Sequence, residues 1–73
     1  MDVYLIGLCR DYIDLVDRQR GGSSLTPEEL HALDQQRLVT HRQLCDHTGK
    51  VPAEDMYNYC KAVLHAARGS NYQ

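Results

Sequence analysis

The ten residues from Gly21 to Leu30, which read GGSSLTPEEL, decide how this chain folds. Thr26 is a typical N-cap residue, Pro27 suits the first helical position, and Glu29 stands at the spacing of a capping box. Gly21 is placed to adopt the left-handed conformation that commonly ends a helix. The stretch therefore predicts that one helix ends near residue 20 and that a second helix begins at Pro27.

Residues 2–20 predict an amphipathic helix with Asp2 as its N-cap. Its apolar side chains span an arc of about 200°, whereas a surface helix needs little more than about 100°. The arc holds Tyr4, Leu5, Ile6, Leu8, Cys9, Tyr12, Ile13, Leu15 and Val16. This width means either that the helix is wedged between two neighbours or that it presents part of its arc to a partner. Gly7 costs about 1 kcal/mol relative to Ala inside a helix, and a close helix crossing there would explain its presence.

The rest of the chain predicts two more helices, over residues 27–47 and about 52–68, and no segment alternates with the period of a strand. The third helix carries a regular apolar stripe of Met56, Cys60, Val63, Leu64 and Ala67. Residues 69–73 are typical of a flexible tail. We therefore predict an all-α, compact three-helix domain over residues 1–68, followed by that tail.

Charged residues interrupt the apolar face of the second predicted helix. That face comprises Leu30, Leu33, Leu38, Leu44 and Cys45, and the apolar residues Ala32 and Val39 lie on the opposite side. Asp34, Arg37 and His41 fall within the apolar arc, at spacings that let Asp34 contact Arg37 and Arg37 contact His41. Either the helix is partly solvated and Arg37 packs its stem along the surface, or the cluster binds a partner with Arg37 as its anchor.

The candidate partner-binding residues are Asp34, Arg37 and His41 of the second helix, with Tyr4 and Leu8 of the first. Arginine and tyrosine are enriched at the energetic centres of protein interfaces. An Asp–His pair for catalysis is disfavoured, because no nucleophile stands beside it and a domain of this size offers little room for a cleft.

Composition excludes several other classes of function. Eight Lys and Arg residues against ten Asp and Glu give a net charge of −2, so the chain lacks the positive charge that drives phosphate-backbone binding. No nucleotide-binding loop, catalytic set or cofactor motif is present, and His41, Cys45 and His47 lack the paired spacing of a zinc site. We expect a non-enzymatic protein without cofactor or metal.

The three cysteines, Cys9, Cys45 and Cys60, are too few and odd in number for a disulfide framework. The start Met1-Asp2 shows no basic region of a secretion signal, and no apolar run approaches the roughly 20 residues of a membrane span. A reducing, cytoplasmic location is therefore expected.

A helix-turn-helix DNA-binding unit over His41–Val63 is the main alternative, because Cys45 and Gly49 have the separation of its small residue and its turn glycine. The second helix of this unit would begin with Glu54 and Asp55, where phosphate contacts belong. Carboxylates at that position oppose binding to a polyanion.

Over its full length, the chain resembles small lytic-phage proteins that regulate host transcription. The resemblance rests on the length of 73 residues, on the opening MDVYLIGLC at residues 1–9 and on the compact helical layout. It implies a host-takeover protein that contacts the β and β′ subunits of bacterial RNA polymerase in the host cytoplasm. It also implies inhibition of initiation by displacement of the σ factor, and antitermination. The resemblance assigns no individual contact residue, and a homodimer or a structural role in another complex remains open.

Overall fold

The computed structural model describes residues 2–22, 24–51 and 55–70, which form three helices and, within those ranges, no strand. Helix α1 spans Val3–Arg20, α2 spans Pro27–Thr48 and α3 spans Met56–Ser70. The predicted all-α three-helix fold is confirmed. The third helix was expected to begin near residue 52, and this is wrong for Asp55, which precedes the first helical residue, Met56. The Asp55 carboxylate accepts a hydrogen bond from the Asn58 N–H (3.2 Å) and so caps the N-terminus of α3.

The predicted tail is also shorter than expected, because Gly69 and Ser70 belong to α3. The remaining tail residues 71–73, like Ser23 and residues 52–54, lie outside the described residues.

The helix ends follow the sequence signals with one exception. Asp2 accepts a hydrogen bond from the Leu5 N–H (2.9 Å), and the capping box of Thr26 and Glu29 forms with both of its hydrogen bonds. Gly21 was expected to be left-handed, and this is wrong: its φ is −92° and its N–H donates to the Asp17 carbonyl, so the chain continues in a right-handed turn. Gly49 is the left-handed cap, with a φ of 78°.

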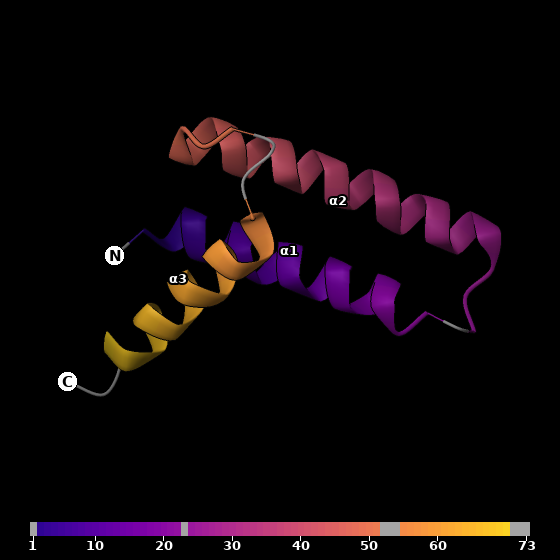
Figure 1. The fold of residues 1–73 in the computed structure, drawn as a ribbon, viewed down its shortest axis with the longest axis horizontal. Helices are drawn as coiled ribbons and strands as arrows, with labels where there is room; N and C mark the ends of the chain where they lie inside the picture. The colour runs from indigo at the N-terminus through magenta and orange to yellow at the C-terminus, as the bar shows by residue number, and fades with distance from the viewer. Residues whose placement is uncertain (1, 23, 52–54, 71–73) are drawn as a thin grey trace.

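Helix α1 lies at the centre of the molecule (Figure 1). α2 runs antiparallel to α1 along its whole length, while α3 packs on α1 and diverges from α2. α2 and α3 scarcely touch each other. The wide apolar arc of α1 is therefore explained mainly by two neighbours, as the wedged interpretation predicted.

All three helices contribute to one core, which consists of Leu8, Cys9, Tyr12, Val16, Leu44, Cys45, Met56 and Cys60. Leu44, Cys9 and Cys60 are fully enclosed. Burial raises the pKa of the Cys9 and Cys60 thiols, so both are held as neutral, poorly nucleophilic groups. None of the helices in the described ranges has an apolar stretch that could cross a lipid bilayer.

Gly7 does not mark a helix crossing, contrary to expectation. It is exposed, and a Cβ built on it meets no atom within 4 Å, so Gly7 lies on a side of α1 that neither neighbouring helix covers.

Gly7→Ala is therefore expected to stabilise the protein by about 0.5–1 kcal/mol, since alanine loses less backbone entropy in a helix. Urea denaturation followed by circular dichroism measures this gain. Gly49→Ala is the matched control and is expected to destabilise, because the left-handed φ strains any residue with a Cβ. A loss of stability in Gly7→Ala would contradict the open environment of this position.

Candidate functional site

The predicted polar cluster on α2 forms only in part. Arg37 donates from Nη2 to the Asp34 carboxylate at 2.9 Å, and this contact lowers the pKa of Asp34. The same bond, with a further one to the Tyr12 hydroxyl, raises the pKa of Arg37. His41 instead places its Nδ1 3.7 Å from the Cys45 sulfur and tilts its ring against Tyr12. Among the described residues, no hydrogen bond joins Arg37 to His41.

The Arg37 side chain lies mostly in the interior of the protein. Its side chain is only 29% exposed, and together with Tyr12, Val16 and Tyr57 it lines the junction where the three helices meet. This position favours the partly solvated, structural interpretation of the α2 cluster.

Arg37→Ala is expected to lower the free energy of unfolding by about 1 kcal/mol, from the lost ion pair and the lost packing of its stem. Thermal or urea denaturation measures the change. Arg42→Ala removes an exposed arginine of the same helix and is expected to change stability by less than about 0.5 kcal/mol. If Arg37→Ala weakened partner binding without loss of stability, Arg37 would be an interface anchor instead.

The two candidates on α1 have different environments. Leu8 is a core residue with 7% exposure, so its side chain packs inside the fold and offers little surface to a partner. Tyr4 is 55% exposed, and its ring packs edge-on against His47, with 4.9 Å between centroids. Of the predicted contact residues, Tyr4 is therefore the most accessible.

His47 and Asp2 join the start of α1 to the last turn of α2. The Asp2 carboxylate lies 2.7 Å from His47 Nε2 and also caps α1 through the Leu5 N–H. Both bonds lower the pKa of Asp2, and the capping bond from the Leu5 N–H has the larger effect.

Stability is therefore expected to depend on the ionisation of Asp2. Because its pKa is lower in the folded chain than in the unfolded chain, its contribution is present above the ordinary aspartate pKa and disappears as the pH falls through the folded value. Urea denaturation between pH 7 and pH 2, compared with Asp2→Asn, measures this contribution. Equal pH dependence in the two proteins would contradict the role assigned to Asp2.

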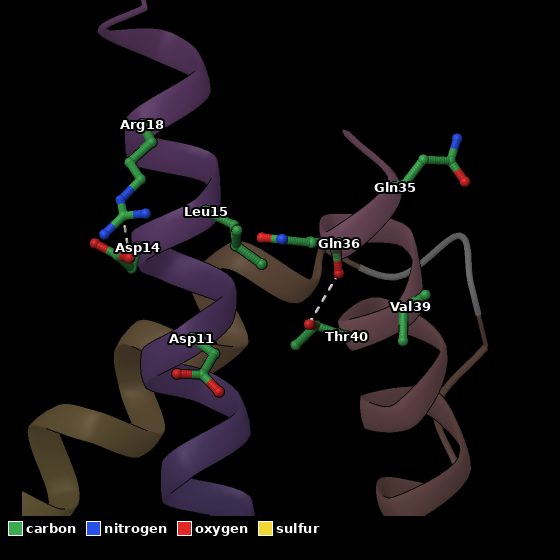
Figure 2. Close-up of a pocket in the computed structure, with 8 residues that line it drawn as sticks. All are labelled: Asp11, Asp14, Leu15, Arg18, Gln35, Gln36, Val39 and Thr40. Carbon is green, nitrogen blue, oxygen red and sulfur yellow. Dashed lines mark hydrogen bonds and ion pairs between the residues drawn. The ribbon is translucent and has the colours of Figure 1, made fainter. Parts of the chain in front are cut away.

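A more accessible site lies on the face that α1 and α2 form together. Two adjoining pockets share Arg18 and Gln36, and we call them together the α1–α2 groove. Its first part is lined by Asp11, Asp14, Leu15, Arg18, Gln35, Gln36, Val39 and Thr40 (Figure 2). Its second part continues past Ala32 and Leu33 to Gly21, Gly22, Ser24 and Leu25. In the described ranges the groove is lined by α1, α2 and their connecting turn.

The side chains of the groove combine an apolar floor with polar edges. Leu15 and Gln36 point toward each other between the helices, whereas Gln35 points away (Figure 2). Thr40 is buried and donates its hydroxyl to the Gln36 carbonyl at 2.9 Å. That internal bond leaves the threonine without need of an outside hydrogen-bond partner. Arg18 pairs with Asp14 at 3.1 Å on the opposite edge.

Sequence reasoning did not select this groove as a site, although one signal for it was present. Val39 and Ala32 stood out as apolar residues on the polar side of α2, and Val39 is 57% exposed in the structure. The residues of α1 that complete the groove gave no signal, because Asp11, Asp14 and Arg18 look like an ordinary solvated face.

No cluster of three or more His, Cys, Asp or Glu side chains in the described ranges has the geometry to hold a metal ion. Comparison of the chain with protein-family models, with curated proteins and with solved structures gave no match.

Proposed function

We propose that this chain is a non-enzymatic regulator that acts by docking on a much larger protein, and that this partner is bacterial RNA polymerase. The observation that carries the protein-binding role is the exposure of α2. Of its 22 residues only Thr40, Leu44 and Cys45 are buried, and the apolar side chains of Leu38 and Val39 are 47% and 57% exposed. A helix this long and this uncovered offers surface that the fold itself does not use.

The size of the molecule agrees with such a role. A standard interface buries about 800 Å² on each partner. That area is about a sixth of the 5162 Å² surface of this chain, so a molecule of this size can supply a standard interface.

The identity of the partner rests on the resemblance to phage transcription regulators. On that basis the chain contacts the β and β′ subunits, inhibits initiation by displacing σ and promotes antitermination. Such proteins act in the cytoplasm of the infected bacterium, and this is the location that we propose.

The DNA-binding alternative has less support. In a helix-turn-helix the two helices pack on each other across a short turn of three or four residues. Here seven residues, 49–55, separate α2 from α3, and the two helices scarcely touch. The ammonium group of Lys61, a cation of the helix that would read DNA, lies over the Tyr57 ring of the same helix, 5.0 Å from its centroid.

Affinity capture from bacterial lysate tests the proposed partner. The full chain is immobilised, and the β and β′ subunits are expected in the eluate from the folded bait and not from resin that carries no bait. Absence of both subunits from the folded bait would make the polymerase assignment wrong. Strongly salt-dependent retention of the chain on duplex DNA would instead support the helix-turn-helix alternative.

A further inference from the structure

We infer that the α1–α2 groove binds an amphipathic α-helix of the partner protein, with an apolar stripe facing the groove and lysine or arginine along the edge that lies over α1. This inference rests on the proposed protein-binding role and specifies its surface and the chemistry of its partner.

The floor of the groove fits the apolar stripe of a helix. Leu15, 8% exposed, lies at the base between the two helices, and Val39 lines the α2 side of the same pocket with 57% of its surface exposed. Thr40 adds a methyl group, because its hydroxyl is already bonded to the Gln36 carbonyl. Amphipathic helices bind such grooves through side chains spaced by three or four residues.

The edge formed by α1 is acidic. Three carboxylates of α1 line the groove, from Asp11, Asp14 and Asp17, and the guanidinium of Arg18 is the one cation lining its described part. Arg18 already pairs with Asp14, and both side chains are more than half exposed. An approaching helix therefore meets a negative edge, which attracts basic side chains and repels acidic ones.

The edge formed by α2 carries one charged residue, Glu29 at its start, whose carboxylate accepts the capping-box hydrogen bond from the Thr26 N–H; the rest of this edge is neutral, and this asymmetry sets the orientation of the bound helix. Gln35, Gln36 and Val39 line this side of the first part of the groove. The groove follows α2 from Glu29 to Thr40, a rise of about 17 Å, which matches about three turns of a partner helix. A basic edge over α1 and an uncharged edge over α2 complement this surface.

Nuclear magnetic resonance titration of the ¹⁵N-labelled full chain tests the groove without the natural partner. The probe is a synthetic three- to four-turn amphipathic helix of leucine and lysine, and its counterpart carries glutamate at every lysine position. The lysine helix is expected to shift the amide signals of Leu15, Gln36, Val39 and Thr40 and to bind at least about tenfold more tightly than the glutamate helix. Equal binding of the two helices, or shifts centred outside the groove, would overturn the inference.

Matched variants separate the groove from the rest of α2. Val39→Asp is expected to weaken binding of the lysine helix by about tenfold or more, whereas Leu38→Asp, at a similarly exposed neighbour outside the groove, is expected to change it by less than about twofold.

Asp11→Lys is expected to weaken binding by about fivefold, and Asp46→Lys, with the same charge change outside the groove, is expected to have little effect. Equal losses in either pair would overturn the inference. So would concentration-dependent shifts at the groove without peptide, because the occupant would then be a second copy of the chain.

The same variants, measured with purified core RNA polymerase, separate this inference from the proposed function. If the wild-type chain binds polymerase and Val39→Asp binds it equally well, the groove is not the docking surface and the proposed function stands. If the wild-type chain binds the lysine helix in the groove but does not bind polymerase, the groove stands and the proposed partner is wrong.

Discussion

Leu44→Ala is expected to lower the free energy of unfolding by about 2–5 kcal/mol. Leu44 is fully enclosed at the centre of the core, where all three helices contribute side chains, so the removed atoms leave a cavity. A chain of 73 residues has a total stability of about 4–11 kcal/mol, so this single change removes a large part of it. Urea denaturation followed by circular dichroism measures the shift in midpoint.

Leu38→Ala is the control for this prediction, because it deletes the same atoms from the same helix at a position that is 47% exposed. Its expected cost is below about 1 kcal/mol, since little apolar surface is lost from the interior. Similar losses in the two variants would contradict the assignment of Leu44, and not Leu38, to the core.

Met56→Ala is expected to lower stability by about 2–5 kcal/mol and to act first on α3. Met56 is 2% exposed at the start of α3, and that helix packs on α1 with little help from α2. Loss of this side chain should therefore reduce the hydrogen-exchange protection of the α3 amides more than that of the α1–α2 pair. Exchange measured by nuclear magnetic resonance gives both values in one experiment.

His65→Ala is the control for Met56→Ala, because His65 is an exposed residue of the same helix. It is expected to leave the protection of α3 nearly unchanged. Uniform loss of protection across all three helices in Met56→Ala would show that α3 does not open separately.

The helices themselves could be predicted from local signals. The capping box at Thr26 and Glu29 and the N-cap at Asp2 satisfy free N–H groups with neighbouring residues, and they form in the structure as expected. The end of α1 was harder to predict, since Gly21 has the residue type of a left-handed cap and the chain nevertheless continues in a right-handed turn. A glycine permits the left-handed conformation without requiring it.

The candidate site could be predicted less well, because contacts between helices depend on how the helices are arranged. Helical spacing correctly placed Asp34 beside Arg37, at 2.9 Å. It did not show that His41 would turn toward Tyr12 of α1, nor that Leu8 would be buried in the shared core. The α1–α2 groove combines residues from two helices, so neither helix alone has the pattern that identifies it.

Fluorescence anisotropy of the labelled full chain, titrated with purified core polymerase, tests directly whether this chain is a docking regulator of RNA polymerase. Saturable one-to-one binding with a Kd below about 10 µM is expected, and added σ factor should reduce it by competition. An unchanged anisotropy up to about 10 µM core polymerase, with the chain shown to be folded by circular dichroism, would contradict it.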